Sequence, residues 1–314
     1  MLDNFIFSLN VSLPVFLVIL AGKLFNKMGL FPESFASMTD KFVFKVALPV
    51  LLFKDISGMD FGQDFDMKFV IFCAVCSFVM FSVVWGLSAL LIKDKSMVGA
   101  FSQGSARGSA AILGIALATN IYGSSGYAPL MVLAAVPVFN VMSVIILEFS
   151  RNDGKGRVDV PVILKGIITN PIILGILAGL PFSVFDITIP TFVMGTVDSI
   201  SKTATPMALL AVGASFSLKD AREKCTPAIF ASFIKLFALP AIFLPIAVMM
   251  GFREGSLVAI FVMLGAPTTV TSYVMAKNMD GDGVLASNIV MLATLLSALS
   301  VTIWVFVLKS LSLI

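Results

Sequence analysis

Apolar runs long enough to cross a membrane recur along the whole chain and are separated by short polar intervals. Ten such runs are present: 5–25, 36–56, 67–92, 97–119, 127–149, 161–182, 191–214, 226–250, 255–277 and 284–308. About 20 helical residues cross a hydrocarbon core of about 30 Å, so each run predicts a membrane-spanning helix. The flank MLDN before the first run holds no Lys or Arg, so we expect a retained helix there rather than a cleaved signal peptide.

The composition agrees with this pattern. Hydrophobic residues fill 59% of the 314 positions and charged residues only 12%, with a mean hydropathy of +1.05. The longest strongly polar interval, RNDGKGRVDV at 151–160, is too short to fold as a domain. We therefore expect an all-α membrane protein that acts within the lipid bilayer. Basic residues cluster only beside the spans, so we expect no nucleic-acid partner.

Basic residues are distributed unequally between the two sides of the predicted spans. The side reached after odd-numbered spans holds twelve: Lys23, Lys27, Lys93, Lys95, Arg151, Lys155, Arg157, Lys165, Lys219, Arg222, Lys224 and Lys277. The opposite side holds four: Lys54, Lys68, Arg253 and Lys309. The positive-inside rule places the richer side in the cytoplasm. We therefore expect both termini on the non-cytoplasmic side of the cell inner (plasma) membrane.

The two halves of the chain, 1–157 and 158–314, resemble each other. An offset of 157 lays LPVFLVILAGKLF (13–25) over NPIILGILAGLPF (170–182). An offset of 160 lays SMVGAFSQGSARGS (96–109) over SLVAIFVMLGAPTT (256–269). Each half holds an odd number of predicted spans, so the second half must cross the membrane in the opposite direction. Such inverted repeats are typical of secondary transporters, and the sequence predicts ten helices in a 5+5 inverted repeat.

Two aligned stretches interrupt the apolar pattern, GSARGS (104–109) in the fourth span and LGAPTT (264–269) in the ninth. Gly and Pro weaken a helix, so we expect both spans to break there and to cross near the bilayer midplane. A broken helix exposes N–H groups that attract anions, and an arginine can hold a carboxylate bidentately. Our candidate substrate-binding residues are Gly104, Ser105, Arg107, Ser109, Asn140, Ala266, Pro267, Thr268, Thr269 and Thr271.

Two interpretations of these stretches stay open. Small residues often serve close helix packing in membranes, and Arg107 could form a structural pair with Asp40, Asp198 or backbone carbonyls. Against this, an ionisable residue inside a membrane marks a functional site by default. We therefore favour a site for a small anionic substrate.

Five further charged residues are candidates for coupling or support: Asp64, Lys68, Lys45, Asp198 and Lys202. Lys45 and Lys202 each lie four residues before a mid-span proline, and Lys202 also lies four residues after Asp198 on one helix face. These two lysines either line a cavity or pair and snorkel toward the interface. Asp64 and Lys68 form either a structural interfacial pair or, through Asp64, a proton-coupling site.

The sequence argues against several kinds of chemistry. It holds no histidine, which disfavours a zinc site or a serine protease within the membrane. Cys73 and Cys76 lie in an apolar span, where we expect packing residues, and we expect no metal and no cofactor. An intramembrane enzyme and a sensor that retained a carrier fold stay as alternatives to a transporter. Coupling to sodium, coupling to protons and uniport all remain open.

Four stretches resemble the auxin efflux carrier family in its bacterial branch, which includes permeases for malonate and other small organic acids. They are SARGSAAILGIALA (105–118), TATPMALLAVGASFSL (203–218), GAPTTVTSYVMA (265–276) and MLATLLSALSV (291–301). The resemblance extends over essentially all ten predicted helices. Two positions depart from the family pattern, which has asparagine where Ser109 stands and often proline where Ala116 stands.

The resemblance implies a division of labour between the helices. Helices 1, 2, 6 and 7 would form a scaffold domain through which two subunits make a homodimer. Helices 3–5 and 8–10 would form a transport domain that carries the crossing and moves like an elevator. Asp64 and Lys68 look like the acidic–basic support pair of the plant members.

Overall fold

The computed structural model describes residues 14, 17–58, 66–109, 126–150, 160–215 and 222–314. All regular structure in these ranges is helical, without strands. Residues 17–27 form the first described helix. The next three elements continue one another without a break: α2 (Glu33–Phe42), the π-helix η1 (Val43–Ala47) and α3 (Leu48–Ser57).

The remaining helices follow in the order that the apolar runs predict. Before the middle of the chain lie α4 (Met67–Leu91), the short 3-10 helix η2 (Lys95–Met97), α5 (Val98–Ala106) and α7 (Ala128–Phe149). After it lie α8 (Val160–Ile168), α9 (Pro171–Val184), α10 (Thr191–Ser201), α11 (Ala204–Ser215), α13 (Cys225–Phe233), the π-helix η3 (Ile234–Ala238), α14 (Leu239–Met249), α15 (Glu254–Gly265), α16 (Val270–Asn278) and α17 (Gly283–Ser310).

The helices provide enough apolar length for a multi-pass membrane protein. Within the described residues, five segments are long and apolar enough to cross a membrane: Met67–Leu91, Ala128–Phe149, Cys225–Met249, Glu254–Asn278 and Gly283–Ser310. The outer surface carries large apolar side chains, such as Met249 at 86% and Leu90 at 81% exposed. A soluble monomer rarely exposes so many large apolar side chains, whereas lipid accepts them.

The sixth and seventh apolar runs are each divided into two helices, which the run lengths did not predict. Between α8 and α9, Asn170 Oδ1 accepts a hydrogen bond from Ile172 N at 2.9 Å, and Pro171 fills the first helical position. This Asn–Pro pair starts a new helix, since it caps one free amide and removes another. Between α10 and α11, Lys202 and Thr203 form a turn.

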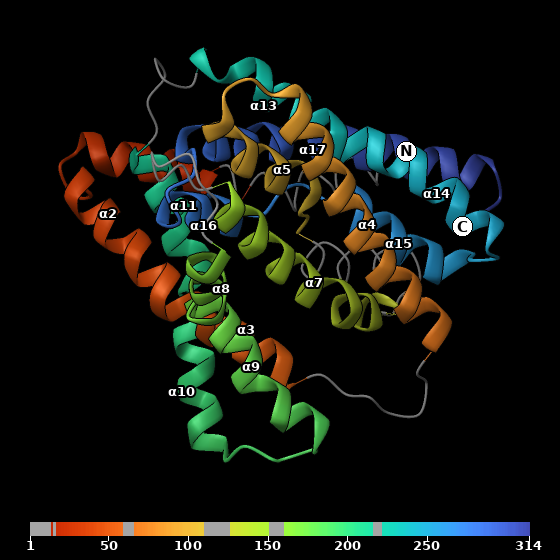
Figure 1. Ribbon diagram of the computed structural model, residues 1–314, viewed down its shortest axis with the longest axis horizontal. Coiled ribbons are helices and arrows are strands. Elements are labelled where there is room, and N and C mark those ends of the chain that lie inside the picture. The colour runs from red at the N-terminus through yellow and green to blue at the C-terminus, as the bar shows by residue number, and fades with distance from the viewer. Residues whose placement is uncertain (1–13, 15–16, 59–65, 110–125, 151–159, 216–221) are drawn as a thin grey trace.

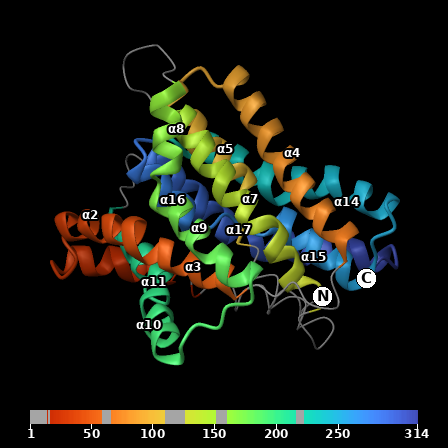
Figure 2. The same ribbon diagram turned by 60° about the horizontal axis from the view of Figure 1, so that its bottom comes forward.

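The described helices fall into two groups around two large apolar cores, and a small third cluster joins α2 and α11. Figures 1 and 2 show α2, α3, α10 and α11 on one side of the molecule and α4, α14 and α15 on the other. One core joins α4, α7, α14, α15 and the C-terminal part of α17. The second core joins α3, α9, α11, α16 and the N-terminal part of α17. The long helix α17 therefore contributes to both.

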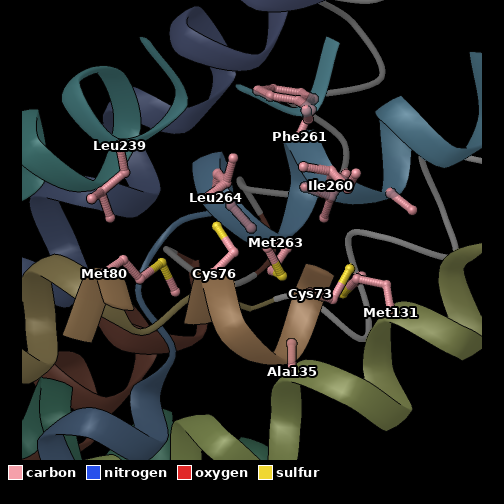
Figure 3. Close-up of a cluster of buried hydrophobic side chains, with 14 of the residues drawn as sticks. Cys73, Cys76, Met80, Met131, Ala135, Leu239, Ile260, Phe261, Met263 and Leu264 are labelled. Carbon is pink, nitrogen blue, oxygen red and sulfur yellow. The ribbon is translucent and has the colours of Figure 1, made fainter. Parts of the chain in front are cut away.

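Cys73 and Cys76 lie in the first core. Both are free thiols and buried. Figure 3 shows them among the side chains of Met131, Met263 and Leu264. Their surroundings are those of small packing residues, as the sequence predicted.

Several glycines allow helices to touch backbone to backbone, and Gly22 and Gly179 are two of them. A Cβ on Gly22 would lie 2.3 Å from the carbonyl oxygen of Leu210, and a Cβ on Gly179 would lie 2.9 Å from that of Phe53. Real Cβ atoms do not approach so closely, so both positions require glycine. The sequence offset of 157 converts one contact into the other, since it carries Gly22 onto Gly179 and Phe53 onto Leu210.

Candidate functional site

Two helices are interrupted where Gly and Pro interrupt the apolar pattern. α5 ends at Ala106, and Arg107 then takes an extended conformation with φ −73° and ψ 132°. α15 ends at Gly265, and the chain stays extended at Ala266 until α16 begins at Val270. Gly104 still lies within α5, so the first break begins later than the start of GSARGS. The continuation of this span, 110–119, lies outside the described residues.

The two interruptions are bonded to each other. Ser109 N donates to the carbonyl oxygen of Pro267 at 2.8 Å. Thr268 Oγ1 donates in return to the carbonyl oxygen of Gly104. Unwound backbone inside a membrane must find its partners within the protein, and here each break supplies partners for the other.

Arg107 lies at this junction, 5% exposed, and within the described residues its polar contacts are with neutral atoms. Its Nη2 donates to Asn140 Oδ1 at 2.6 Å, its Nη1 to Ser143 Oγ at 3.2 Å and its Nε to Thr269 Oγ1 at 3.3 Å. Met275 Sδ adds a contact at 3.3 Å. The guanidinium is therefore well oriented, but these contacts do not neutralise its charge.

The carboxylates that could have paired with Arg107 have other partners. Asp40 pairs with Lys277 at 2.6 Å and accepts from Tyr273 Oη at 3.2 Å. Asp198 pairs with Lys54 and Lys202. Across the described ranges, no carboxylate forms an ion pair with Arg107. The structural pairs considered from the sequence for this arginine are therefore not formed.

A cavity of about 380 Å³ opens beside the junction. The two interruptions make one polar wall, and the other walls come from α3, α7, α10, α11 and α17. The residues that line it are Leu48, Leu51, Leu52, Lys54, Asp55, Arg107, Gly108, Ser109, Val136, Phe139, Asn140, Ser201, Lys202, Thr205, Leu209, Pro267, Thr268, Thr269, Val270, Thr271, Val290 and Thr294. The N-terminal end of α16, which carries the positive end of a helix dipole, thus faces the same space as Arg107.

The structure brings seven of the ten predicted substrate-binding residues to this cavity: Arg107, Ser109, Asn140, Pro267, Thr268, Thr269 and Thr271. The other three lie behind its wall. Gly104 packs against Ile289, where a Cβ would meet Ile289 Cδ1 at 2.8 Å. Ser105 and Ala266 are fully buried.

The predicted coupling residues are dispersed. Lys45 is exposed and does not line the cavity, whereas Lys202 lines the cavity and pairs with Asp198. Lys68 is exposed, donates to the carbonyl oxygen of Met250 at 2.6 Å and lies over the Phe252 ring. Asp64 lies outside the described residues, so its pairing with Lys68 stays a prediction.

Sequence reasoning missed several polar residues at the site. Asp55, Thr205 and Thr294 line the cavity from within apolar runs, and so does Lys54, which the sequence indicated only as a charge beside a span. Lys235 is fully buried next to the two breaks. The sequence could have indicated this residue, because a lysine in the middle of an apolar span points to a functional site as strongly as Arg107 does.

A cluster of charges ties three segments together at the ends of helices, outside the spans. Lys224 lies 3.2 Å from Asp282 and 3.6 Å from Asp94. The hydroxyl of Ser96, which donates to Asp94 at 2.6 Å, and the ammonium of Lys224 hold the pKa of Asp94 below its usual value. Burial lowers the pKa of Lys224, but the two carboxylates raise it by more.

Comparisons with known proteins show that the chain is similar to membrane transporters. The family model described as "Membrane transport protein" matches residues 7–305. An "Uncharacterized transporter" of Methanothermobacter thermautotrophicus is 21% identical over 308 residues, covering 97% of this chain and 99% of the relative. An uncharacterized transporter of Methanocaldococcus jannaschii is 24% identical over 310 residues, covering 96% and 98%. A protein of Rhizobium meliloti named "Putative malonate transporter" is 22% identical over 304 residues, covering 95% of each chain.

Proposed function

The chain belongs to the membrane transport protein family, which is the auxin efflux carrier family that its sequence resembles, and from this premise we propose that it carries a small organic anion across the membrane. The substrate class is the part of the proposal that the site supports most directly. The mechanism is proposed from the way α3 and α11 face the two interruptions across the cavity.

The observation that carries the proposal is a buried arginine without a carboxylate partner, among the described residues, on a cavity wall. An uncompensated charge inside a protein is costly unless a counter-charge and hydrogen bonds satisfy it. Arg107 has hydrogen-bond partners in Asn140, Ser143 and Thr269, but its positive charge is left for a ligand to balance. A carboxylate at this wall would also receive hydrogen bonds from the hydroxyls of Thr269 and Thr271 and would face the N-terminal end of α16.

The size and lining of the cavity favour a small molecule. A volume of about 380 Å³ lies at the lower end of the usual range for small-molecule sites, about 300–1,000 Å³. Leu48, Leu52 and Phe139 provide apolar contacts, and Lys54 lies on the wall formed by α3. A short mono- or dicarboxylate fits this combination, and the name of the Rhizobium meliloti relative refers to one such compound.

We also propose that ten helices form the 5+5 inverted repeat and that the transport group moves against a scaffold like an elevator. The matching contacts of Gly22 with Leu210 and of Gly179 with Phe53 support the repeat, since one offset relates them. The cavity supports the movement, because scaffold elements α3 and α11 face the crossing across it. A homodimer through the scaffold, a plasma-membrane location and non-cytoplasmic termini complete the proposal.

Uptake into proteoliposomes tests the substrate class. Wild type should accumulate malonate or succinate but not malonamide, which has the same size without charge. Arg107→Gln should lower the rate or affinity by roughly 30-fold or more, as expected when one partner of a buried charge pair is removed. Lys309→Gln removes the same charge from an exposed position and should leave uptake unchanged. Equal uptake of malonamide, or full activity of Arg107→Gln, would contradict the proposal.

A further inference from the structure

Lys235 connects the ends of both interrupted helices. Its side chain is completely buried, with 0% exposed. Its Nζ donates to the carbonyl oxygen of Ala106 at 3.1 Å and to that of Met263, also at 3.1 Å. Ala106 is the last residue of α5, and Met263 lies in the last turn of α15. A single ammonium group thus bridges the C-terminal ends of the two half-helices.

The electrostatic potential around Lys235 Nζ is negative and therefore favours a cation. The last carbonyls of a helix lack intrahelical partners and carry a partial negative charge. Two such ends meet here, so their negative potentials add. In the part of the chain that the structure describes, no carboxylate pairs with Lys235. The negative ends of α5 and α15 are therefore its counter-charge.

The neighbouring residues are shaped to hold this side chain. A Cβ on Gly108 would lie 2.9 Å from Lys235 Nζ, so glycine at this position leaves room for the ammonium. Lys235 lies in η3, where Leu239 N bonds to the carbonyl oxygen of Ile234, one residue further back than in an α-helix. Trp304 Nε1 donates to the carbonyl oxygen of Leu236 at 2.9 Å, which fixes the wider turn.

We propose that Lys235 is a built-in cation of the crossing: its ammonium takes the place of a coupling sodium ion, and transport therefore needs no sodium. In secondary transporters with broken helices, carbonyls at half-helix C-terminal ends are ligands for the coupling cation. In this chain two carbonyls of that kind already hold a covalently attached positive charge. The inference builds on the proposed anion transport, but the cation site can be tested without any substrate.

The first test measures thermal unfolding of purified protein in sodium, potassium or choline chloride at equal ionic strength. Wild type and Lys235→Arg should have the same midpoint in all three salts. Lys235→Ala vacates the space between the carbonyls, so its midpoint should be low in choline and should rise by a few degrees with sodium or methylammonium. Lys235→Met fills the space with an apolar chain, so its midpoint should be low in every salt.

A merely structural role would lower stability without creating a response to cations. The proposal is overturned if wild type is stabilised by sodium over choline, or if Lys235→Ala responds to neither sodium nor methylammonium. If Lys235→Ala cannot be purified in choline, its recovery in sodium or methylammonium becomes the readout. Failure to recover it in any salt also counts against the proposal.

Uptake of malonate into proteoliposomes supplies the second test. Wild type should take up malonate equally with sodium or choline on both sides, whereas Lys235→Ala should be inactive in choline and regain uptake in sodium. A strict sodium requirement of wild type would refute the built-in cation while leaving anion transport intact. Absence of malonate uptake together with a sodium-responsive Lys235→Ala would refute the substrate class while leaving the cation site intact.

Discussion

Replacing Asn140 with Asp would place a carboxylate beside the guanidinium of Arg107 without changing the shape of the side chain. Asn140 Oδ1 accepts from Arg107 Nη2 at 2.6 Å, and the two residues are 0% and 5% exposed. The new carboxylate would neutralise the arginine from within the protein. If Arg107 binds the substrate through its unbalanced charge, Asn140→Asp must weaken anion binding.

The expected loss of substrate affinity follows from the charged hydrogen bond that Arg107 would no longer make to the substrate. Hydrogen bonds to charged groups contribute about 1.5–3 kcal/mol, so losing one corresponds to roughly 10- to 150-fold weaker substrate binding. The unliganded protein gains the new ion pair but loses another bond, since Asn140 Nδ2 now donates to the carbonyl oxygen of Val136 at 2.9 Å. We therefore expect only a small change in the unfolding midpoint together with a large change in affinity.

The assay compares the malonate KM in proteoliposomes and the malonate-induced rise of the unfolding midpoint. Asn26→Asp is the matched control, because this amide donates to the carbonyl oxygen of Phe31 at 3.1 Å, away from the cavity. An unchanged KM in Asn140→Asp would show that the charge of Arg107 does not bind the substrate. An equal loss of malonate affinity in Asn26→Asp would show that any added negative charge, or a folding defect, causes the effect.

Three further substitutions test contacts between helices. Gly108→Ala would bring a methyl group 2.9 Å from Lys235 Nζ, so we expect a loss of about 1–3 kcal/mol, measured by thermal unfolding in detergent. Gly22→Ala would bring a methyl group 2.3 Å from the backbone oxygen of Leu210, which cannot move aside; we expect little monodisperse protein in size-exclusion chromatography. Asp40→Asn would remove a charged partner from its lysine on α16, so we expect a loss of about 1.5–3 kcal/mol by thermal unfolding.

Two other glycines serve as controls for these alanine substitutions. Among the described residues, and apart from the backbone of the same helix, no heavy atom lies within 4 Å of a Cβ built on Gly86 in α4 or on Gly195 in α10. Alanine there should keep or raise the midpoint, since it reduces the entropy of the unfolded chain. A fall at Gly86 or Gly195 as large as at Gly108 would remove the steric argument. An unchanged unfolding midpoint in Asp40→Asn would mean that solvent already stabilises the ammonium group of Lys277.

The sequence predicted the positions of the breaks because their cause is local. Gly and Pro act on the backbone of their own helix, so the clusters GSARGS and LGAPTT located the interruptions closely, although Pro137 and Pro245 lie inside continuous helices. The divisions at Asn170 and at Lys202 were missed, since long apolar windows concealed the Asn–Pro start signal of α9. Length alone indicates that a run can cross a membrane, but not that it is one helix.

The partners of the charged residues could not be predicted, because they come from distant segments. Arg107 bonds to Asn140 on α7, and Lys235 reaches the ends of two other helices. Asp198 pairs with Lys202 one turn away, which the spacing left as one of two alternatives, and also with Lys54 on α3, which the spacing could not indicate. Only the three-dimensional packing decides which of several charges in a membrane stays unbalanced.

The π-helix η3 has a consequence for how this part of the fold can vary. The helix that contains it changes neighbours half-way, since α13 packs against α5 and α17 whereas α14 packs against α15. A residue turns an α-helix by about 100°, so one added residue rotates the apolar stripe of α14 relative to that of α13. The offset between the two stripes lets each half of the helix face its own neighbours. Deleting one residue within Ile234–Ala238 would remove this offset, and the apolar stripe of one half would then no longer face its neighbours.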